Sequence, residues 1–253
     1  MSQKNEETLL ALRRGKIDVQ GEFLWGSNYT FLVKSEYEGK AYPAVYKPVR
    51  GERPLWDFPV ATLARREVAA YLVSEALGWE LVPPTIYRKK APVGPGSIQL
   101  FVEHDPEYHY FNFSEADQQR LRPTALFDLL INNADRKGSH ILIDPQNHIW
   151  LIDHGVTFHV EEKLRTVIWD FAGEQLPDDL CTGLEGFVQK LRQVNLQAGE
   201  TPPELSEDPL VQLTSYINKE EIKALLARAE ALVKKHVYPP PNPYRRPYPW
   251  PQI

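Results

Sequence analysis

The sequence predicts an α+β fold with two lobes, a β-rich first part followed by a mostly helical second part. Short runs rich in Val, Tyr, Phe and Thr, the residue types that favour strands, occupy much of the first hundred residues. Beyond residue 104 the apolar residues recur mainly at helical spacing, interrupted by one predicted hairpin. Because the two patterns are segregated along the chain, we expect two lobes that join near residues 102–105.

The first part is predicted to contain two helices among its strands. A short helix over 6–14 ends at Gly15, and a longer one begins after Thr62, its expected N-cap, and ends at Gly78. The predicted strands are 16–19, 21–25, 30–35, 42–48, 85–88 and 97–102. The tripeptide Glu38–Gly39–Lys40 is typical of a hairpin turn between two of these strands.

The second part is predicted to be helical around one hairpin. Ser114 is the expected N-cap of a helical run, and Pro123 precedes a second apolar run, TALFDLLINNAD. Two short strands, 140–143 and 148–152, follow, joined by a polar turn. Further helices are predicted over 161–171, 179–195 and 218–236, with a loop over 199–209.

The last residues form a separate tail. Residues 238–253 contain seven Pro and therefore cannot form regular helix or sheet. Such a tail is either disordered or packed, and its aromatic residues favour packing along the second lobe. We therefore expect an N-terminal lobe over 1–103, a helical lobe over 104–237 and a Pro- and aromatic-rich tail over 238–253.

Composition excludes several classes of protein. The chain has 253 residues with 29 Lys and Arg against 34 Asp and Glu, a net charge of −5, which argues against a nucleic-acid partner. The single cysteine, Cys181, excludes an intramolecular disulfide framework and a cysteine-built zinc site. No signal-peptide core, membrane-spanning run or basic amphipathic segment stands out, so we expect a cytoplasmic protein that binds neither nucleic acid nor membrane.

Two carboxylates lie where ordinary patterning would not place them. Asp153 ends the apolar run IWLI and is followed closely by Gly155, so it stands at the end of a buried strand beside a flexible turn. Asp135 lies in the polar loop NNADRKGSH, which follows an apolar helix. Taken alone, Asp135 is as well explained as a loop cap, but paired with Asp153 it indicates a functional site.

This order of helix, acidic loop, hairpin and second acid resembles the catalytic and metal-binding loops of the phosphatidylinositol-3/4-kinase-like (protein-kinase-like) superfamily. The segments that carry the resemblance are YKPVRGERPLWDFP, REVAAYLVSEALGW, VPPT, NNADRKGSH, IDHGVTFH and EKLRTVIW. They are most similar to a small bacterial branch of that superfamily, and HipA-type kinases are more distantly similar. The resemblance implies a two-lobed protein-kinase-like fold that transfers a phosphoryl group from ATP, with Mg²⁺ or Mn²⁺, to a hydroxyl acceptor.

The resemblance also implies roles for residues of the second lobe. Asp135 would position the attacking hydroxyl, Lys137 would offset charge on the transferring group, and Asp153 would bind the metal. His140, five residues after Asp135, stands where the pattern expects Asn as a second metal ligand. Because an imidazole nitrogen is a softer ligand than an amide oxygen, His140 favours Mn²⁺ or Zn²⁺ over Mg²⁺. His154 replaces the Phe of the usual Asp-Phe-Gly triplet.

In the first lobe the resemblance implies a nucleotide site. Lys47, in AVYKPV, would contact the phosphates and be held by Glu67 on the following helix. The expected phosphate-covering loop, GEFLWGSNYTF, is poor in Gly, so Ser27 and Asn28 would hydrogen-bond the phosphates instead. Adenine is expected near Gln99 to Val102, where the lobes join.

Three alternatives remain open at this point. The chain could be a pseudokinase that binds nucleotide as a regulatory module, or a nucleotidyl transferase that moves AMP on the same fold. A zinc hydrolase built from His140, His148, His154 and His159 is a weaker alternative, because the spacing is not helical and no HExxH motif is present. Only a few residues separate Gly155 from the helix expected near 161, which favours a small-molecule acceptor over a peptide. The sequence carries no signal for the oligomeric state.

Overall fold

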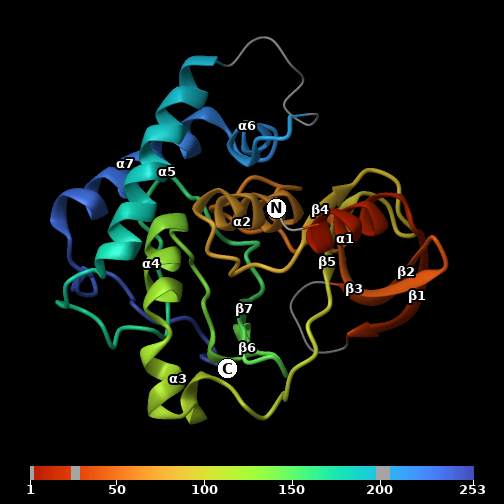
Figure 1. Ribbon diagram of the computed structural model, residues 1–253, viewed down its shortest axis with the longest axis horizontal. Coiled ribbons are helices and arrows are strands. Elements are labelled where there is room, and N and C mark those ends of the chain that lie inside the picture. The colour runs from red at the N-terminus through yellow and green to blue at the C-terminus, as the bar shows by residue number, and fades with distance from the viewer. Residues whose placement is uncertain (1–2, 24–28, 198–205) are drawn as a thin grey trace.

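A five-stranded antiparallel sheet forms the N-terminal part of the computed structural model, which describes residues 3–23, 29–197 and 206–253 (Figure 1). The strand order is β1-β2-β3-β5-β4. The strands are β1 Lys16–Phe23, β2 Thr30–Tyr37, β3 Lys40–Pro48, β4 Thr85–Arg88 and β5 Gly96–Leu100. The predicted strands are confirmed as regions within the described residues, with 16–19 and 21–23 merged into one strand that is irregular between Val19 and Gly21. Residues 24 and 25 of the predicted strand 21–25 lie outside the described residues.

Strand alternation determines which residues of β3 face the site. Ala44, Tyr46 and Pro48 are buried, whereas Val45 and Lys47 between them are partly exposed. Because successive side chains of a strand point to opposite faces of the sheet, Val45 and Lys47 share one face, and both line the cavity described below. The sheet therefore delivers Lys47 into that cavity.

Helices α1 Gln3–Arg14 and α2 Leu63–Leu77 pack against the sheet, and α2 also contacts helices of the second part (Figure 1). Gly78 ends α2 in the left-handed conformation, with φ of 68°, as predicted. The predicted N-cap Thr62 occupies its position but makes no capping hydrogen bond with its side chain. Instead, the carboxylate of Glu52 accepts hydrogen bonds from the backbone N–H groups of Leu63 and Ala64.

The second part is mostly helical and has one small hairpin. Its elements are α3 Glu115–Gln119, α4 Arg122–Ile131, β6 Ile141–Ile143, β7 Ile149–Leu151, α5 Asp178–Gln197, α6 Pro209–Leu213 and α7 Lys219–Lys235, besides the 3₁₀ turns η1 Val49–Gly51, η2 Tyr110–Asn112 and η3 Gly138–His140. Ser114 caps α3 through its side chain, as predicted. A continuous apolar core runs from the sheet through α2 to the helices. No helix in the described ranges is long and apolar enough to cross a membrane.

The helix predicted over 161–171 is wrong. No regular helix lies between β7 and α5, because backbone groups of this stretch bond to other parts of the chain rather than to each other. Arg165 N donates to Asn133 O at 2.8 Å, and Arg136 N donates to Arg165 O at 3.0 Å. These tertiary hydrogen bonds replace the i to i−4 bonds that the apolar periodicity suggested.

The tail packs along the helical part as predicted, but of its aromatic residues only Tyr238 is buried, whereas Tyr244, Tyr248 and Trp250 are exposed. Tyr238 is buried, its ring lies against Phe171, and its hydroxyl donates to the carbonyl of Arg122. Further along the tail Pro249 is buried, whereas Tyr244 is fully exposed.

Candidate active site

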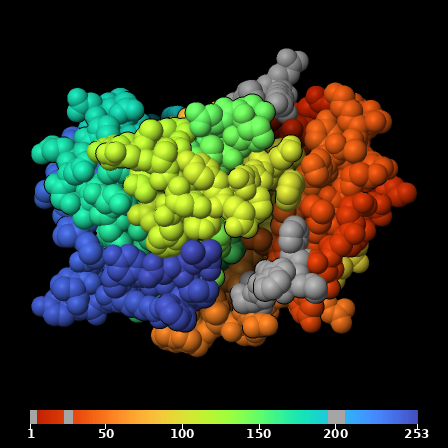
Figure 2. All heavy atoms as spheres, turned by 90° about the horizontal axis from the view of Figure 1, so that it is seen from below, coloured from red at the N-terminus to blue at the C-terminus, as the bar shows by residue number. Residues whose placement is uncertain are grey.

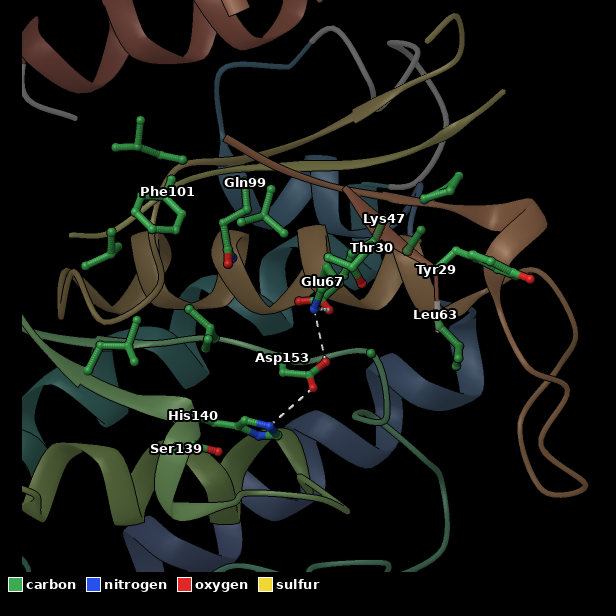
Figure 3. A pocket seen from close by; sticks show the side chains of 18 of the residues that line it. Tyr29, Thr30, Lys47, Leu63, Glu67, Gln99, Phe101, Ser139, His140 and Asp153 are labelled. Atoms are coloured by element: carbon green, nitrogen blue, oxygen red, sulfur yellow. Dashed lines mark hydrogen bonds and ion pairs between the residues drawn. The ribbon is translucent and has the colours of Figure 1, made fainter. Parts of the chain in front are cut away.

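A cavity of about 360 Å³ lies between the sheet and the helical part of the molecule (Figure 3). One portion of its lining is apolar and comes from both parts: Val45, Phe101, Val102, Leu142 and Ile152. Leu63 also lines the cavity but lies on the other side of Lys47 and Glu67 from Phe101 (Figure 3). The remaining lining carries charged and titratable side chains, among them Lys47, Glu52, Glu67, His140 and Asp153. An apolar slot that opens onto a charged end suits a ligand with a flat ring and an anionic group.

Lys47 is the positive centre of the charged end. Its Nζ lies 2.5 Å from Oε1 of Glu67 on α2 and 3.0 Å from Oδ1 of Asp153. The surrounding protein opposes a charge on Lys47, but the carboxylates of Asp153 and Glu67 outweigh this effect and raise its pKa well above the usual value. Lys47 therefore stays protonated across the physiological range and joins three elements far apart in the sequence.

Asp153 lies two residues beyond β7, which ends at Leu151. Its φ of 62° is in the left-handed region, which costs a residue other than Gly about 1–3 kcal/mol and is often found at functional sites. The backbone N–H of the next residue, His154, donates to Oε2 of Glu67 at 2.9 Å. The ammonium of Lys47 holds the pKa of Asp153 far below its usual range, so this carboxylate is ionised.

The ring of His140 points toward the carboxylate of Asp153 (Figure 3). Its Nε2 lies 3.3 Å from Oδ2 of Asp153. Burial lowers the pKa of His140 to about 4, so the imidazole is neutral at physiological pH and can offer a nitrogen lone pair to a metal. Lys137 N donates to Nδ1 of His140 at 3.5 Å, so the ring proton lies on Nε2 and points toward the ionised Asp153. A cation held by Nε2 would displace that proton to Nδ1 and break the long hydrogen bond from Lys137.

Asp135 and Lys137 lie in the loop beside the cavity rather than in its lining. Nζ of Lys137 is 3.7 Å from Oδ2 of Asp135. Burial raises the pKa of Asp135 to about 6, with the charge of Asp153 adding to the rise and the cations of Lys137 and Arg165 opposing it. A carboxylate with a pKa near the working pH is suited to accept a proton.

Sequence reasoning missed the buried ion pair that shapes this loop. The guanidinium of Arg136 is fully buried and lies 3.0 Å from Asp128 on α4, whose side chain is equally buried. Arg136 also donates to the carbonyls of Ile152 and His140. Because one carbonyl belongs to His140 and the other precedes Asp153, Arg136 connects the helix, the acidic loop and the turn that carries Asp153. The available signal was Asp128 itself, a carboxylate within the apolar run ALFDLLI.

Asn133 and His154 also shape the site rather than facing a ligand. Asn133 donates to Asp128 and accepts a hydrogen bond from the backbone N–H of Asp135. His154 is fully buried, with its Nε2 2.8 Å from Nη2 of Arg136. Since a guanidinium can only donate, Nε2 of His154 is the acceptor, and burial holds the pKa of this imidazole well below its usual value.

The remaining predicted nucleotide residues divide into two groups. Gln99 and Val102 line the apolar end of the cavity, and Gln99 donates from its side chain to Thr85. Ser27 and Asn28 lie outside the described residues. Tyr29 and Thr30, which follow them directly, line the cavity.

The histidines do not form a metal cluster. Nε2 of His148 lies 2.8 Å from the carbonyl of Glu80, and His159 packs against Phe58. Among the residues that the structure describes, no group of three or more His, Cys, Asp and Glu side chains could hold a metal by itself. His140 and Asp153 alone suit a cation such as Mn²⁺ whose other ligands come from nucleotide phosphates, the usual arrangement in phosphoryl-transfer sites.

The five-stranded sheet, the helical second part and the cavity between them form a protein-kinase-like fold. The chain is similar to the Golgi casein kinase with Mn/ADP bound, with a TM-score of 0.52 and 16% identity over 93% of this chain and 76% of that one. It is also similar to hydra Fam20 with sugar, with a TM-score of 0.50 and 15% identity over 93% of this chain and 89% of that one. At these identities the likeness shows the fold alone.

The sequence comparisons identify the family. Protein Rv2133c of Mycobacterium tuberculosis (strain ATCC 25618 / H37Rv) is 40% identical over 276 residues, 95% of this chain and 93% of that protein. The chain belongs to the same family as Rv2133c. Phosphatidylinositol 4-kinase gamma 4 of Oryza sativa subsp. japonica is 27% identical over 165 residues, 51% of this chain but 29% of the rice protein. No protein-family model matches the sequence.

Proposed function

We propose that this chain is a phosphotransferase that moves the γ-phosphoryl group of ATP to an alcohol acceptor. The single observation that carries the proposal is the position of Lys47, bound to both Glu67 and Asp153 at the charged end of the cavity. Phosphoryl transfer requires positioning and charge neutralisation rather than covalent chemistry, and this arrangement supplies a fixed cation beside an ionised carboxylate.

The nucleotide would lie along the cavity. Its base would occupy the apolar end, near Gln99 and Val102, and its phosphates would approach Lys47, with Ser27 and Asn28 proposed to hydrogen-bond them. Asp153 and His140 would hold Mg²⁺ or Mn²⁺, which when bound would neutralise charge on the phosphates. Asp135 would orient the acceptor hydroxyl and accept its proton, and Lys137 would offset charge on the transferring group.

We propose a small molecule rather than an extended peptide as the acceptor. The helix expected near 161 is absent. The preference for a small molecule is supported instead by contacts of the segment after Asp153. The side chain of Asn132 accepts from Lys163 N and donates to the carbonyls of His159 and Glu161. Thr166 N bonds to the tail. A segment bonded in this way offers few backbone groups to an extended substrate.

We also propose the domain boundaries 1–103, 104–237 and 238–253. The last strand of the sheet ends at Leu100, the next regular element begins at Tyr110, and α7 ends at Lys235. The continuous apolar core supports two lobes that fold together rather than as independent units.

Nucleotide binding and transfer test the proposal separately. We expect ADP with Mn²⁺ to raise the melting temperature of the intact chain, and Asp135→Asn to retain that shift while losing transfer of the γ-phosphoryl group of ATP. Asp18→Asn, which changes an exposed carboxylate on β1, is the matched control and should behave as the intact chain. Full transfer by Asp135→Asn would refute the assigned roles.

Two other results would point to the alternatives. Binding of ADP without ATP turnover by the intact chain would indicate a nucleotide-binding regulatory module. A product heavier by AMP rather than by phosphate would indicate a nucleotidyl transferase.

A further inference from the structure

The last residues of the chain pack across the loop that carries Asp135. Beyond α7 the tail first pairs with residues 173–176: Tyr238 N donates to Glu174 O, and Gly173 N donates to Tyr238 O, each at 2.9 Å. These bonds and the buried Tyr238 fix the start of the tail on the helical lobe. Residues 245–253, here called the C-terminal segment, then continue toward the loop over 132–140 that carries Asp135, here called the catalytic loop. Figure 2 shows the blue C-terminal part of the chain lying directly against lime-coloured residues of that lobe.

The first contact of the C-terminal segment is made by one carbonyl. Pro247 O accepts hydrogen bonds from Thr166 N at 3.0 Å and from Nε1 of Trp169 at 3.2 Å. Thr166 pairs with Arg136 in an isolated parallel bridge, and its hydroxyl donates to Oδ2 of Asp128 at 3.1 Å. The carbonyl of Pro247 therefore supports the buried Asp128–Arg136 pair from outside.

The second contact is made directly to the catalytic loop. Gln252 O accepts a hydrogen bond of 2.7 Å from Gly138 N. Gly138 lies between Asp135 and His140, and an added Cβ there would come within 2.9 Å of the ring of Phe111. The loop is thus held between this ring on one side and a backbone carbonyl of the C-terminal segment on the other.

The nucleotide cavity adjoins these contacts only through Ser139 and His140, which follow Gly138 and line it. Its lining, as far as the structure describes it, ends at Gly155, and no residue of the C-terminal segment belongs to it. Loosening the loop should therefore affect transfer and metal binding at His140, whereas binding of ADP without metal, which uses the sheet and α2 side of the cavity, should not change.

We propose that the C-terminal segment positions the catalytic loop through the carbonyls of Pro247 and Gln252, and that this positioning is required for transfer. The proposal rests on the proposed function for its catalytic consequence but not for its effect on the loop. Trp169, which donates to Pro247 O, is a positioning residue because it helps to hold the C-terminal segment in place.

The test compares the intact chain with a variant that ends at Tyr244. This truncation keeps the buried Tyr238 and removes both carbonyls. We expect binding of ADP without metal to stay within twofold, turnover of ATP to fall at least tenfold, and amide exchange in 133–140 to rise at least tenfold. Exchange in β3 should not change. A synthetic peptide of residues 245–253, added in excess, should restore part of the turnover.

Two point variants separate positioning from general stability. Trp169→Phe keeps an aromatic side chain, although a smaller one, and removes the Nε1 donor. It should lower turnover several-fold with faster exchange at 165–169. Tyr244→Ala changes a side chain that is 95% exposed and should behave as the intact chain. Trp169→Phe also decides the question if the truncated chain does not fold.

Three results would overturn the proposal. The first is unchanged turnover and loop exchange in the truncated chain. The second is a uniform rise of exchange with a parallel loss of ADP binding, which would indicate a merely structural role. The third applies if the truncated chain does not fold: turnover and exchange of Trp169→Phe that equal those of the intact chain. If the intact chain turns over no ATP, the proposed function fails, and loop exchange alone decides: a rise confined to 133–140 and 165–169 supports the proposal, and no rise refutes it.

Discussion

Replacing Lys137 should move the acid limb of the pH–rate profile to higher pH. The proposed base, Asp135, has a pKa of about 6 because burial opposes its charge, while Lys137 at 3.7 Å favours the ionised form. Transfer needs the ionised carboxylate, so the rate should rise with pH through about 6. Lys137→Met removes the stabilising cation, raises the pKa of Asp135 further, and shifts this limb to higher pH.

The size of the shift follows from the separation of the two groups. Unit charges about 4 Å apart interact by ~1 kcal/mol in bulk water and by ~4 kcal/mol at an effective dielectric constant of 20. Both side chains are partly exposed, 20% for Lys137 and 33% for Asp135, so the lower part of that range applies. Since one pKa unit corresponds to ~1.4 kcal/mol, we expect the limb to move by about one unit, to roughly pH 7.

The assay is the ATP turnover rate between pH 5 and 8 at constant ionic strength. Metal is kept in excess, because a free terminal phosphate also titrates near pH 6. The position of the limb is compared rather than the height of the plateau, since Lys137 is also proposed to act on the transferring group. Lys137→Arg keeps the charge and should leave the limb in place. A limb that stays near pH 6 in Lys137→Met, or moves downward, would refute the assignment of Asp135.

Three further predictions follow from the same geometry. Arg136→Met should cost ~3–5 kcal/mol in urea unfolding, because it leaves Asp128 buried without its cation. The control Arg120→Met, in a more exposed pair with Asp117, should cost under ~1 kcal/mol, and equal losses would contradict the buried-pair argument. His140→Asn should shift the ratio of Mg²⁺- to Mn²⁺-supported ADP binding toward Mg²⁺ by about tenfold, or ~1.4 kcal/mol; an unchanged ratio would remove His140 from the metal site. Gly96→Ala should lower stability by ~1–3 kcal/mol and weaken ADP binding, because its Cβ would come within 2.4 Å of Lys47 O and separate β3 from β5. At Gly21 a Cβ meets nothing within 4 Å, so Gly21→Ala should change neither, and equal effects of the two variants would disprove the steric argument.

The resemblance to the kinase-like superfamily, carried by separate motifs, was enough to find the charged end of the cavity. Lys47, Glu67 and Asp153 were predicted from separate motifs, and the structure joins them through direct ion pairs. Each lies on or directly beside a regular element whose periodicity is visible in the sequence. For such residues the local pattern fixes the side-chain direction, and the packing of the elements brings the side chains together.

The segment between Asp153 and α5 could not be predicted in the same way. EKLRTVIW has helical periodicity, but its backbone bonds to Asn133, Arg136 and Pro247, which are distant in sequence. The Asp128–Arg136 pair was missed for a related reason, because an ion pair buried by tertiary packing leaves no periodic signal. The contacts of the tail through Pro247 and Gln252 involve backbone carbonyls, which every residue carries and which no sequence pattern can distinguish.

The most direct test of the central claim is a crystal structure of the chain with an ATP analogue and Mn²⁺. The account predicts an anomalous Mn²⁺ peak between Oδ2 of Asp153 and Nε2 of His140, with the phosphates beside Lys47 and the base near Gln99 and Val102. A nucleotide bound outside this cavity, or bound within it without Mn²⁺ at Asp153, would contradict the account.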